Sequence, residues 1–159
     1  MKPLFPEPWP LFSPGKVFMV QESEPTLLQR LMPGEGPLQL AILLAIPKGQ
    51  QLPEEDRNLL IKTVEWKEVA VSAASVLVVG IPLTGVRFPT LQRQVQAPRW
   101  LAFGLSPLQL GLQVHTPGQA PIVFRGIKMA FSPSLKELRA HDQLKRTFFW
   151  QCLKPLMQS

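Results

Sequence analysis

Of all segments in this sequence, the run Leu38–Ile46 restricts the possible folds most. Its residues, LQLAILLAI, are nearly all apolar, and the run has the length of one strand. A continuous apolar run of this length is typical of a strand covered on both faces, as strands of parallel sheets are. Two more short apolar runs follow, over Ser75–Gly80 and Trp100–Gly104. We therefore expect a sheet with buried central strands.

The segments between these strands carry helix signals. Pro53 stands at the first position of an expected helix that ends near Lys67, and three acidic residues follow it, where they complement the helix dipole. A short helical turn is expected over Thr90–Gln96. Alternation of strand and helix implies right-handed crossovers and parallel neighbours. The sequence thus predicts an α/β fold, a three-layer α/β/α domain with a small, mainly parallel central sheet.

The carboxyl-terminal third predicts one more strand pair and two helical segments. A strand or hairpin is expected over Pro121–Phe124 and Ile127–Phe131. Ser134 and Glu137 then have the spacing of a capping box, which marks the start of a helix.

A second helical segment, from Asp142, carries a wide apolar stripe. Its members are Leu144, Phe148 and Cys152, with Phe149, Leu153 and Leu156 beside them. Burial of such side chains contributes about 1.5–3 kcal/mol each, so we expect this segment to be integral to the core. Pro155 should lie near its last turn. Trp150 on this segment and Trp100 on a strand are both expected in the core, whereas Trp66 at a helix end is ambiguous.

Residues 1–15 differ from the rest because five prolines interrupt them. Neither a helix nor a central strand can form there, yet large apolar side chains alternate with the prolines. Trp9 in such a segment is the kind of aromatic anchor that fills a partner's pocket, although the segment could also fold back on its own domain. We interpret residues 1–15 as a partner-binding arm and residues 16–159 as one α/β domain. Within the latter, Lys16–Gln21 is expected to be an edge strand and Gln29–Pro37 a loop.

Composition favours a cytoplasmic protein that does not enter membranes. The single cysteine, Cys152, cannot form an internal disulfide, and its apolar neighbours indicate a small core residue. Residues 1–14 lack the basic and apolar order of a secretory signal. The longest apolar stretch, Val69–Leu83, is shorter than the roughly 20 residues that a membrane-spanning helix needs.

Charge is distributed unevenly along the chain. Residues 1–68 hold 7 Lys/Arg and 9 Asp/Glu, whereas residues 69–159 hold 10 Lys/Arg and 2 Asp/Glu. A basic half favours an acidic partner or a nucleic acid, or it is simply a solvated face. The candidate basic surface consists of Arg99, Arg125, Lys128, Arg139, Lys145 and Arg146.

Enumeration of reactive residues predicts no catalytic set, no cofactor and no metal site. The chain has two histidines, and His141 is adjacent to Asp142, so on a helix these two side chains cannot form an orienting pair. The acidic cluster of residues 54–56 is explained by the helix dipole. His115, His141 and Cys152 lack the short paired spacings of metal ligands, and no phosphate-binding loop follows Gly34.

Two segments resemble one known family. Phe131–Gln151 contains Ser-Pro-x-Leu-x-x-Leu-Arg-Ala and ends on a Trp-Gln pair, and it resembles the carboxyl-terminal region of the psi subunit of the bacterial DNA polymerase III clamp-loader complex. Residues 9–15, Trp-Pro-Leu-Phe-Ser-Pro-Gly, are similar to a Trp-x-Leu-x-x-Pro-Gly stretch near the amino terminus of that family.

The resemblance implies a non-catalytic accessory subunit that bridges the clamp loader to other replication proteins. In this family the arm docks onto the AAA+ clamp-loader subunits, which assigns the contact here to Trp9, Leu11, Phe12 and Pro14. It also implies pairing with a chi-like subunit that contacts single-strand binding protein, and hence an indirect association with DNA.

The family's fold is similar to that of uracil-DNA glycosylase, which gives a rival interpretation. Leu101–Pro107 looks like an altered water-activating motif, and Phe131–Leu135 like an altered His-Ser-Pro motif. Ser106 replaces the acid and Phe131 replaces the histidine, so the base and the oxyanion stabiliser are missing. The alternative function is therefore a nucleic-acid-binding domain on a glycosylase-like scaffold that lacks catalytic residues.

Overall fold

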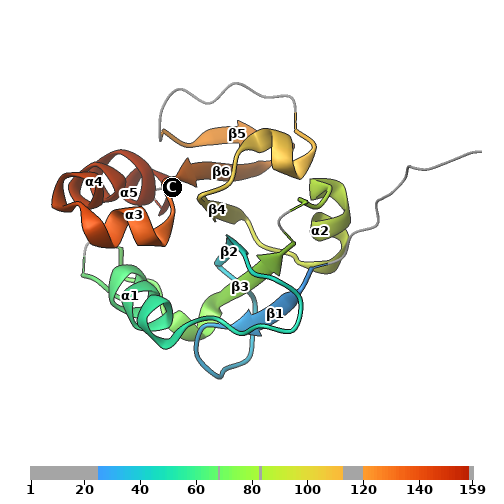
Figure 1. Cartoon of the computed structure of the whole chain (residues 1–159), viewed down its shortest axis with the longest axis horizontal. Coiled ribbons are helices and arrows are strands. Elements are labelled where there is room, and N and C mark those ends of the chain that lie inside the picture. Colours follow the sequence, from blue (N-terminus) through green and yellow to red (C-terminus); the bar gives the residue numbers. More distant parts are fainter. Residues whose placement is uncertain (1–24, 68, 83, 113–119, 158–159) are drawn as a thin grey trace, which may run out of the picture.

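A six-stranded mixed sheet forms the centre of the computed structural model, which describes residues 25–67, 69–82, 84–112 and 120–157 (Figure 1). The strands are β1 (Leu27–Arg30), β2 (Leu40–Ala45), β3 (Val76–Ile81), β4 (Arg99–Phe103), β5 (Ile122–Phe124) and β6 (Ile127–Ser132). Their order in the sheet is β1-β3-β2-β4-β6-β5. The pairs β2–β3, β2–β4 and β4–β6 are parallel, while β1 and β5 pair antiparallel at the two edges.

Helices flank this sheet, which agrees with the expected α/β class. They are α1 (Glu54–Val64), α2 (Phe88–Gln94), α3 (Leu135–Ala140), α4 (Asp142–Thr147), the π-helix η4 (Phe148–Leu153) and α5 (Lys154–Met157). Two short 3-10 turns, η2 (Ala73–Ser75) and η3 (Pro107–Leu110), precede β3 and follow β4. Figure 1 shows α1 and α3–α5 on one side of the strands and α2 on the other.

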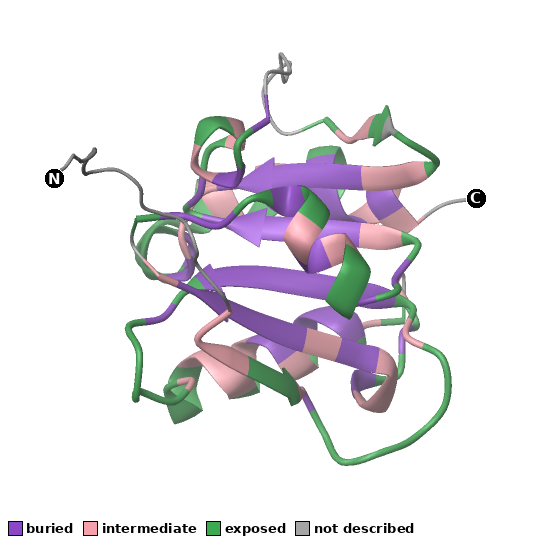
Figure 2. Cartoon of the chain, turned by 90° about the vertical axis from the view of Figure 1, so that its right-hand side faces the viewer, coloured by how far each residue is buried: buried purple, intermediate pink, exposed green. Residues whose placement is uncertain are grey.

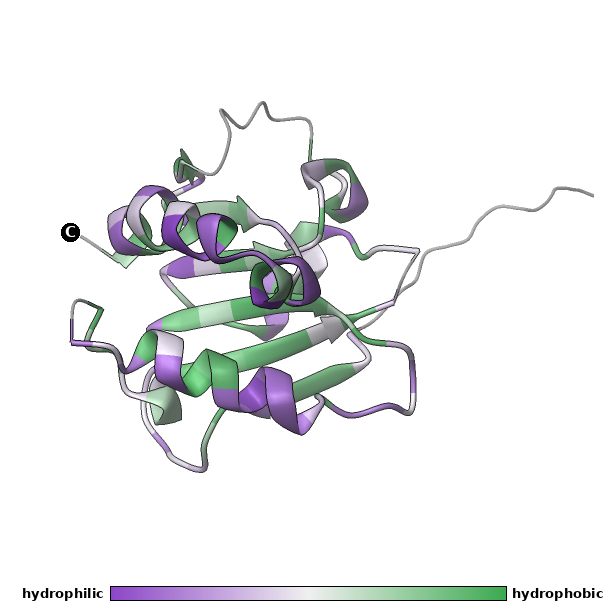
Figure 3. Cartoon of the chain, turned by 60° about the vertical axis from the view of Figure 1, so that its left-hand side comes forward, coloured by the Kyte–Doolittle hydropathy of each residue, from purple (hydrophilic) through white to green (hydrophobic). Residues whose placement is uncertain are grey.

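Strand β2 is covered on both of its faces, which explains why its sequence is apolar throughout. Leu40, Ile42 and Leu44 pack into the core that also contains α1 and the carboxyl-terminal helices. Ala41 and Leu43 point the opposite way, into the core around α2. Alternate residues of a strand face opposite sides of the sheet, so a strand covered on both sides needs apolar residues at every position. The buried central strands are visible in Figure 2, and their hydrophobic character in Figure 3.

Within the described residues, the expected strands and helices are confirmed with shifted ends, but strand β1 was not predicted. The helix expected to reach Lys67 ends at Val64, because the chain turns there and the Trp66 carbonyl accepts hydrogen bonds from Val69 and Ala70 (2.8 and 2.7 Å). The loop prediction for Gln29–Pro37 is wrong at its start, since β1 includes Gln29 and Arg30. The arm and the strand expected at residues 16–21 lie outside the described residues.

The carboxyl-terminal segment is part of the core, as expected. Phe148, Cys152, Leu153 and Leu156 are all buried in the core on the α1 side. Pro155 lies in the final helix α5, directly after the π-helical turn, in agreement with its expected place. Within the described part of the chain, no helix has the length and apolar character to cross a membrane.

Candidate functional site

The first candidate site is the edge of the sheet where the parallel strands β2, β3, β4 and β6 end. Ligands of open α/β folds bind at this edge, outside the carboxyl ends of the strands. Both segments that resemble glycosylase motifs reach it, with Ser106 just after β4 and Phe131 near the end of β6. The contacts that these two segments make at this edge therefore indicate their role in this chain.

Phe131 and its neighbours are part of the packed interior. The Phe131 side chain is 7% exposed and belongs to the core around α2. The Ser132 hydroxyl donates to the Pro133 carbonyl (3.0 Å), and the Ser132 carbonyl accepts from the Gly104 N–H (2.8 Å). The aromatic ring and these hydrogen bonds give this segment a structural role.

Ser106 and Gln109 join the loops that follow β4 and β3. The Ser106 N–H donates to the Gln109 side-chain oxygen (2.9 Å), and the Gln109 carbonyl accepts from the Val86 N–H (3.1 Å). Gly85 comes so close to this carbonyl that a Cβ there would lie 3.1 Å from the Gln109 carbonyl carbon. The loops after β3 and β4 are thus in direct contact, and backbone groups at this edge bond to one another.

The loop after β6 is packed in the same way. A Cβ added to Gly104 would lie 2.9 Å from the Ser134 Cβ. Ser134 caps α3 as its sequence predicts: its hydroxyl accepts from the Glu137 N–H (3.2 Å), and Glu137 Oε1 accepts from the Ser134 N–H (3.2 Å). The Glu137 carboxylate therefore serves as a helix cap.

The acidic cluster at the start of α1 has a partner that the sequence did not reveal. Arg139 on α3 forms an ion pair with Glu55, and its Nη1 lies 3.5 Å from Asp56 Oδ1. These acids complement the dipole of α1, as expected, and they also tie α1 to α3. No sequence signal could connect residues 84 positions apart.

The other titratable groups fall outside this cluster. Asp142 is almost fully exposed and lies 3.9 Å from Lys145. Among the residues that the structure describes, no three His, Cys, Asp or Glu side chains are arranged to hold a metal ion. His115 lies outside these residues.

Arg139, Lys145, Arg99 and Lys128 belong to the candidate basic surface, and each of them bonds to another group of the chain. Besides Arg139 and Lys145, Arg99 Nε donates to the Leu156 carbonyl (3.1 Å) and Lys128 Nζ to the Pro155 carbonyl (3.1 Å). Arg99 and Lys128 lie opposite each other in the β4–β6 register, so both anchor the last helix.

The remaining two residues of that set occupy different elements. Arg125 lies in the tight β5–β6 turn with a φ of 50°, and Arg146 is exposed on α4. A shared nucleic-acid surface of all six residues stays a prediction. The same holds for the clamp-loader contact of Trp9, Leu11, Phe12 and Pro14, which lie outside the described residues.

Two predicted core residues are confirmed and one is wrong. Trp100 is 1% exposed, and its indole N–H donates to the Ala97 carbonyl (3.0 Å). Cys152 is fully buried, and this burial raises the pKa of its thiol to about 12. Trp150, in contrast, is 55% exposed. It stands two residues from both Phe148 and Cys152, and residues two apart point to different faces of a helix.

Trp150 belongs to a second candidate site, which we call the aromatic cluster and which consists of Trp66, Phe149 and Trp150. The Trp66 ring centroid lies 4.6 Å from that of Phe149 and 6.3 Å from that of Trp150, the latter edge to face. Lys154 Nζ lies 4.6 Å from the centre of the Trp150 ring. No local sequence signal marks this cluster, because Trp66 and Phe149 are far apart in the chain.

Comparisons with known proteins give no family for this chain. No protein-family model matches it, no curated protein matches it, and no solved structure matches it. The proposals that follow therefore rest on the sequence, the fold and the two candidate sites.

Proposed function

We propose that this chain is a non-catalytic, cytoplasmic accessory subunit of the replicative clamp loader, of the psi type. In this proposal the domain is a three-layer α/β/α scaffold with a mainly parallel centre, and residues 1–15 form the arm that docks onto the AAA+ subunits. The domain would connect the clamp loader to further replication proteins, including a chi-like subunit.

The observation that carries the proposal is the packing of Phe131. In a glycosylase this position would have to offer a polar group to the reaction, whereas here it holds a buried phenyl ring. Ser106, at the position of the motif's acid, bonds to the side chain of Gln109, whose carbonyl accepts from the Val86 N–H and so joins two loops. Both motif positions thus contribute to the packing of the fold, which supports a binding role over glycosylase chemistry.

The composition of the arm supports the same role. It combines large apolar side chains with prolines, which fix φ and reduce the number of conformations of the free segment. Binding such a segment costs less conformational entropy than binding a fully flexible one. Trp9 would be its central anchor, since tryptophan is enriched among the residues that dominate interface energies.

A pull-down with purified clamp loader tests the proposal. The full chain should be retained, and a chain that begins at Lys16 should be lost. Trp150→Ala is the matched control, because it removes an exposed tryptophan outside the arm and should leave retention unchanged. Equal retention of the full and shortened chains would contradict docking through the arm.

A nucleic-acid-binding role on the same scaffold is the second candidate function. The observation that favours it is the aromatic cluster with its exposed Trp150, whose surroundings are described next.

A further inference from the structure

The aromatic cluster is held in a defined place by the backbone on both of its sides. On the α1 side, the Trp66 carbonyl accepts hydrogen bonds from two successive N–H groups, and the Val71 N–H returns to the Val64 carbonyl (2.8 Å). On the other side, Phe149 and Trp150 belong to the π-helix η4, whose next residues Cys152 and Leu153 are buried. Phe149 contacts both Trp66 and the buried Phe148. The backbone that carries the exposed Trp150 ring is therefore held in place by hydrogen bonds and buried neighbours.

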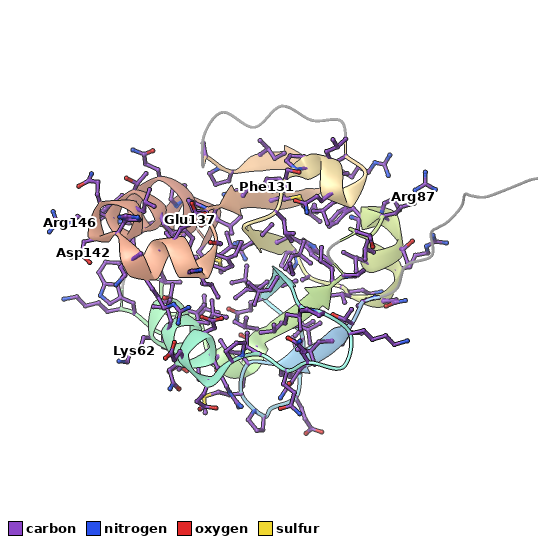
Figure 4. The ribbon with its side chains drawn as sticks, viewed as in Figure 1. Lys62, Arg87, Phe131, Glu137, Asp142 and Arg146 are labelled. Carbon is purple, nitrogen blue, oxygen red and sulfur yellow. The ribbon has the colours of Figure 1, made fainter. Side chains whose placement is uncertain are left out.

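Four cations flank the members of this cluster along the chain, and one of them, Lys154, lies against the Trp150 ring. Lys62 lies in the last turn of α1, and Lys67 follows Trp66 directly; both side chains are exposed. Arg146 and Lys154 stand four residues before and four residues after Trp150 in the terminal helical segment. Figure 4 shows Lys62 and Arg146 on the same side of the molecule, extending from α1 and α4.

Cations outnumber acidic residues in this region: residues 62–68 and 142–154 together hold five Lys/Arg and three Asp/Glu. Glu65 Oε2 accepts a hydrogen bond from the Ala73 N–H (3.2 Å). Asp142 lies 3.9 Å from Lys145, so that pair is close to neutral. This excess of positive charge around the aromatic cluster favours an anion.

From this combination we propose that the aromatic cluster and its cations bind single-stranded nucleic acid. Phosphates match the cations, and unpaired bases stack on exposed aromatic rings irrespective of sequence. A duplex hides the faces of its bases and would use only the cations. A second copy of this chain would bring like charges together at this surface. An acidic polypeptide would match the cations but offers no flat rings to Trp150.

Fluorescence anisotropy of labelled 20-nucleotide dT and rU strands with the full chain tests this proposal. Binding should weaken steeply as salt rises, because phosphate contacts release counterions. Trp150→Ala should weaken binding about tenfold, and Trp150→Phe should restore part of it, since one stacked base is worth about 1–3 kcal/mol. Arg146→Ala should lower the slope of log K against log salt by about one.

Two control variants test whether the loss of any exposed apolar or basic side chain weakens binding of the strands. Leu108→Ala removes an exposed apolar side chain on η3 (78% exposed), and Arg93→Ala removes an exposed cation on α2. Both should bind the strands like the parent chain. Circular dichroism of each variant reports whether the fold is retained.

Three results would overturn the proposal. The first is that the strands do not bind at low salt, and the second is that the parent chain and Trp150→Ala bind them equally well. The third is that poly-glutamate displaces the labelled strands as effectively as unlabelled dT does. The last result would assign the surface to an acidic polypeptide. Retention of Trp150→Ala on the clamp loader separates this site from arm docking, so either proposal can fail alone.

Discussion

Replacement of Gly85 by alanine probes the closed edge of the sheet directly. Gly85 has a φ of +92°, where an L-residue costs about 1–2 kcal/mol. The new Cβ would also clash with the Gln109 carbonyl oxygen, which accepts the Val86 N–H. Relieving such overpacking costs about 1–3 kcal/mol. We therefore expect Gly85→Ala to lower the free energy of unfolding by about 2–5 kcal/mol.

Gly126→Ala is the matched control for backbone strain. Gly126 has a similar φ of +82°, but no atom lies within 4 Å of an added Cβ. Its loss should be about 1–2 kcal/mol, from strain alone. Urea unfolding followed by tryptophan fluorescence measures both variants, and a common slope would show that only stability has changed. If the two variants lost the same stability, the loops after β3 and β4 would not be in contact as described.

Three further predictions concern the core and the carboxyl-terminal helix. Arg99→Met should lower the free energy of unfolding in urea by about 1–2 kcal/mol, because it removes the donor to the Leu156 carbonyl. Arg93→Met is its control, since Arg93 donates to the Pro89 carbonyl within its own helix. A loss for Arg99→Met no greater than that for Arg93→Met would contradict the anchoring role of Arg99. Trp100→Ala should cost about 3–5 kcal/mol in the same assay and Trp150→Ala less than about 1, and similar costs would refute their opposite burial. The pKa of the Cys152 thiol is about 12 in the folded chain against an ordinary 9.0, so the thiol ionises at lower pH in the unfolded chain. The free energy of unfolding should therefore fall by up to about 1.4 kcal/mol per pH unit from pH 9 to 12. If the unfolding midpoint of Cys152→Ala fell equally over this range, the thiol would make no such contribution.

The strands and helices that fill the core were readable from the sequence because their signals are local. Leu38–Ile46 is apolar at nearly every position and has strand length, which is the pattern that a strand covered on both faces needs. Ser134 and Glu137 mark the start of α3 by their spacing alone. β1 was missed because it is a short edge strand in which Leu28 and Gln29 are exposed, so neither alternation nor continuous hydrophobicity marks it.

The candidate sites were less predictable, because they depend on contacts between distant segments. The bonds of Arg99 and Lys128 to the last helix join residues 57 and 27 positions apart. The contact between Trp66 and Phe149 is of the same kind. Trp150 is a different case, since its distance of two residues from the stripe positions Phe148 and Cys152 already indicated the opposite face.

The dissociation constant of the full chain for the clamp loader, compared with that of Trp9→Ala, tests the central claim most directly. A tryptophan that anchors an interface contributes at least about 2 kcal/mol, so the constant should rise at least about thirtyfold. An unchanged constant would contradict the assignment of this chain as a clamp-loader subunit that docks through its arm.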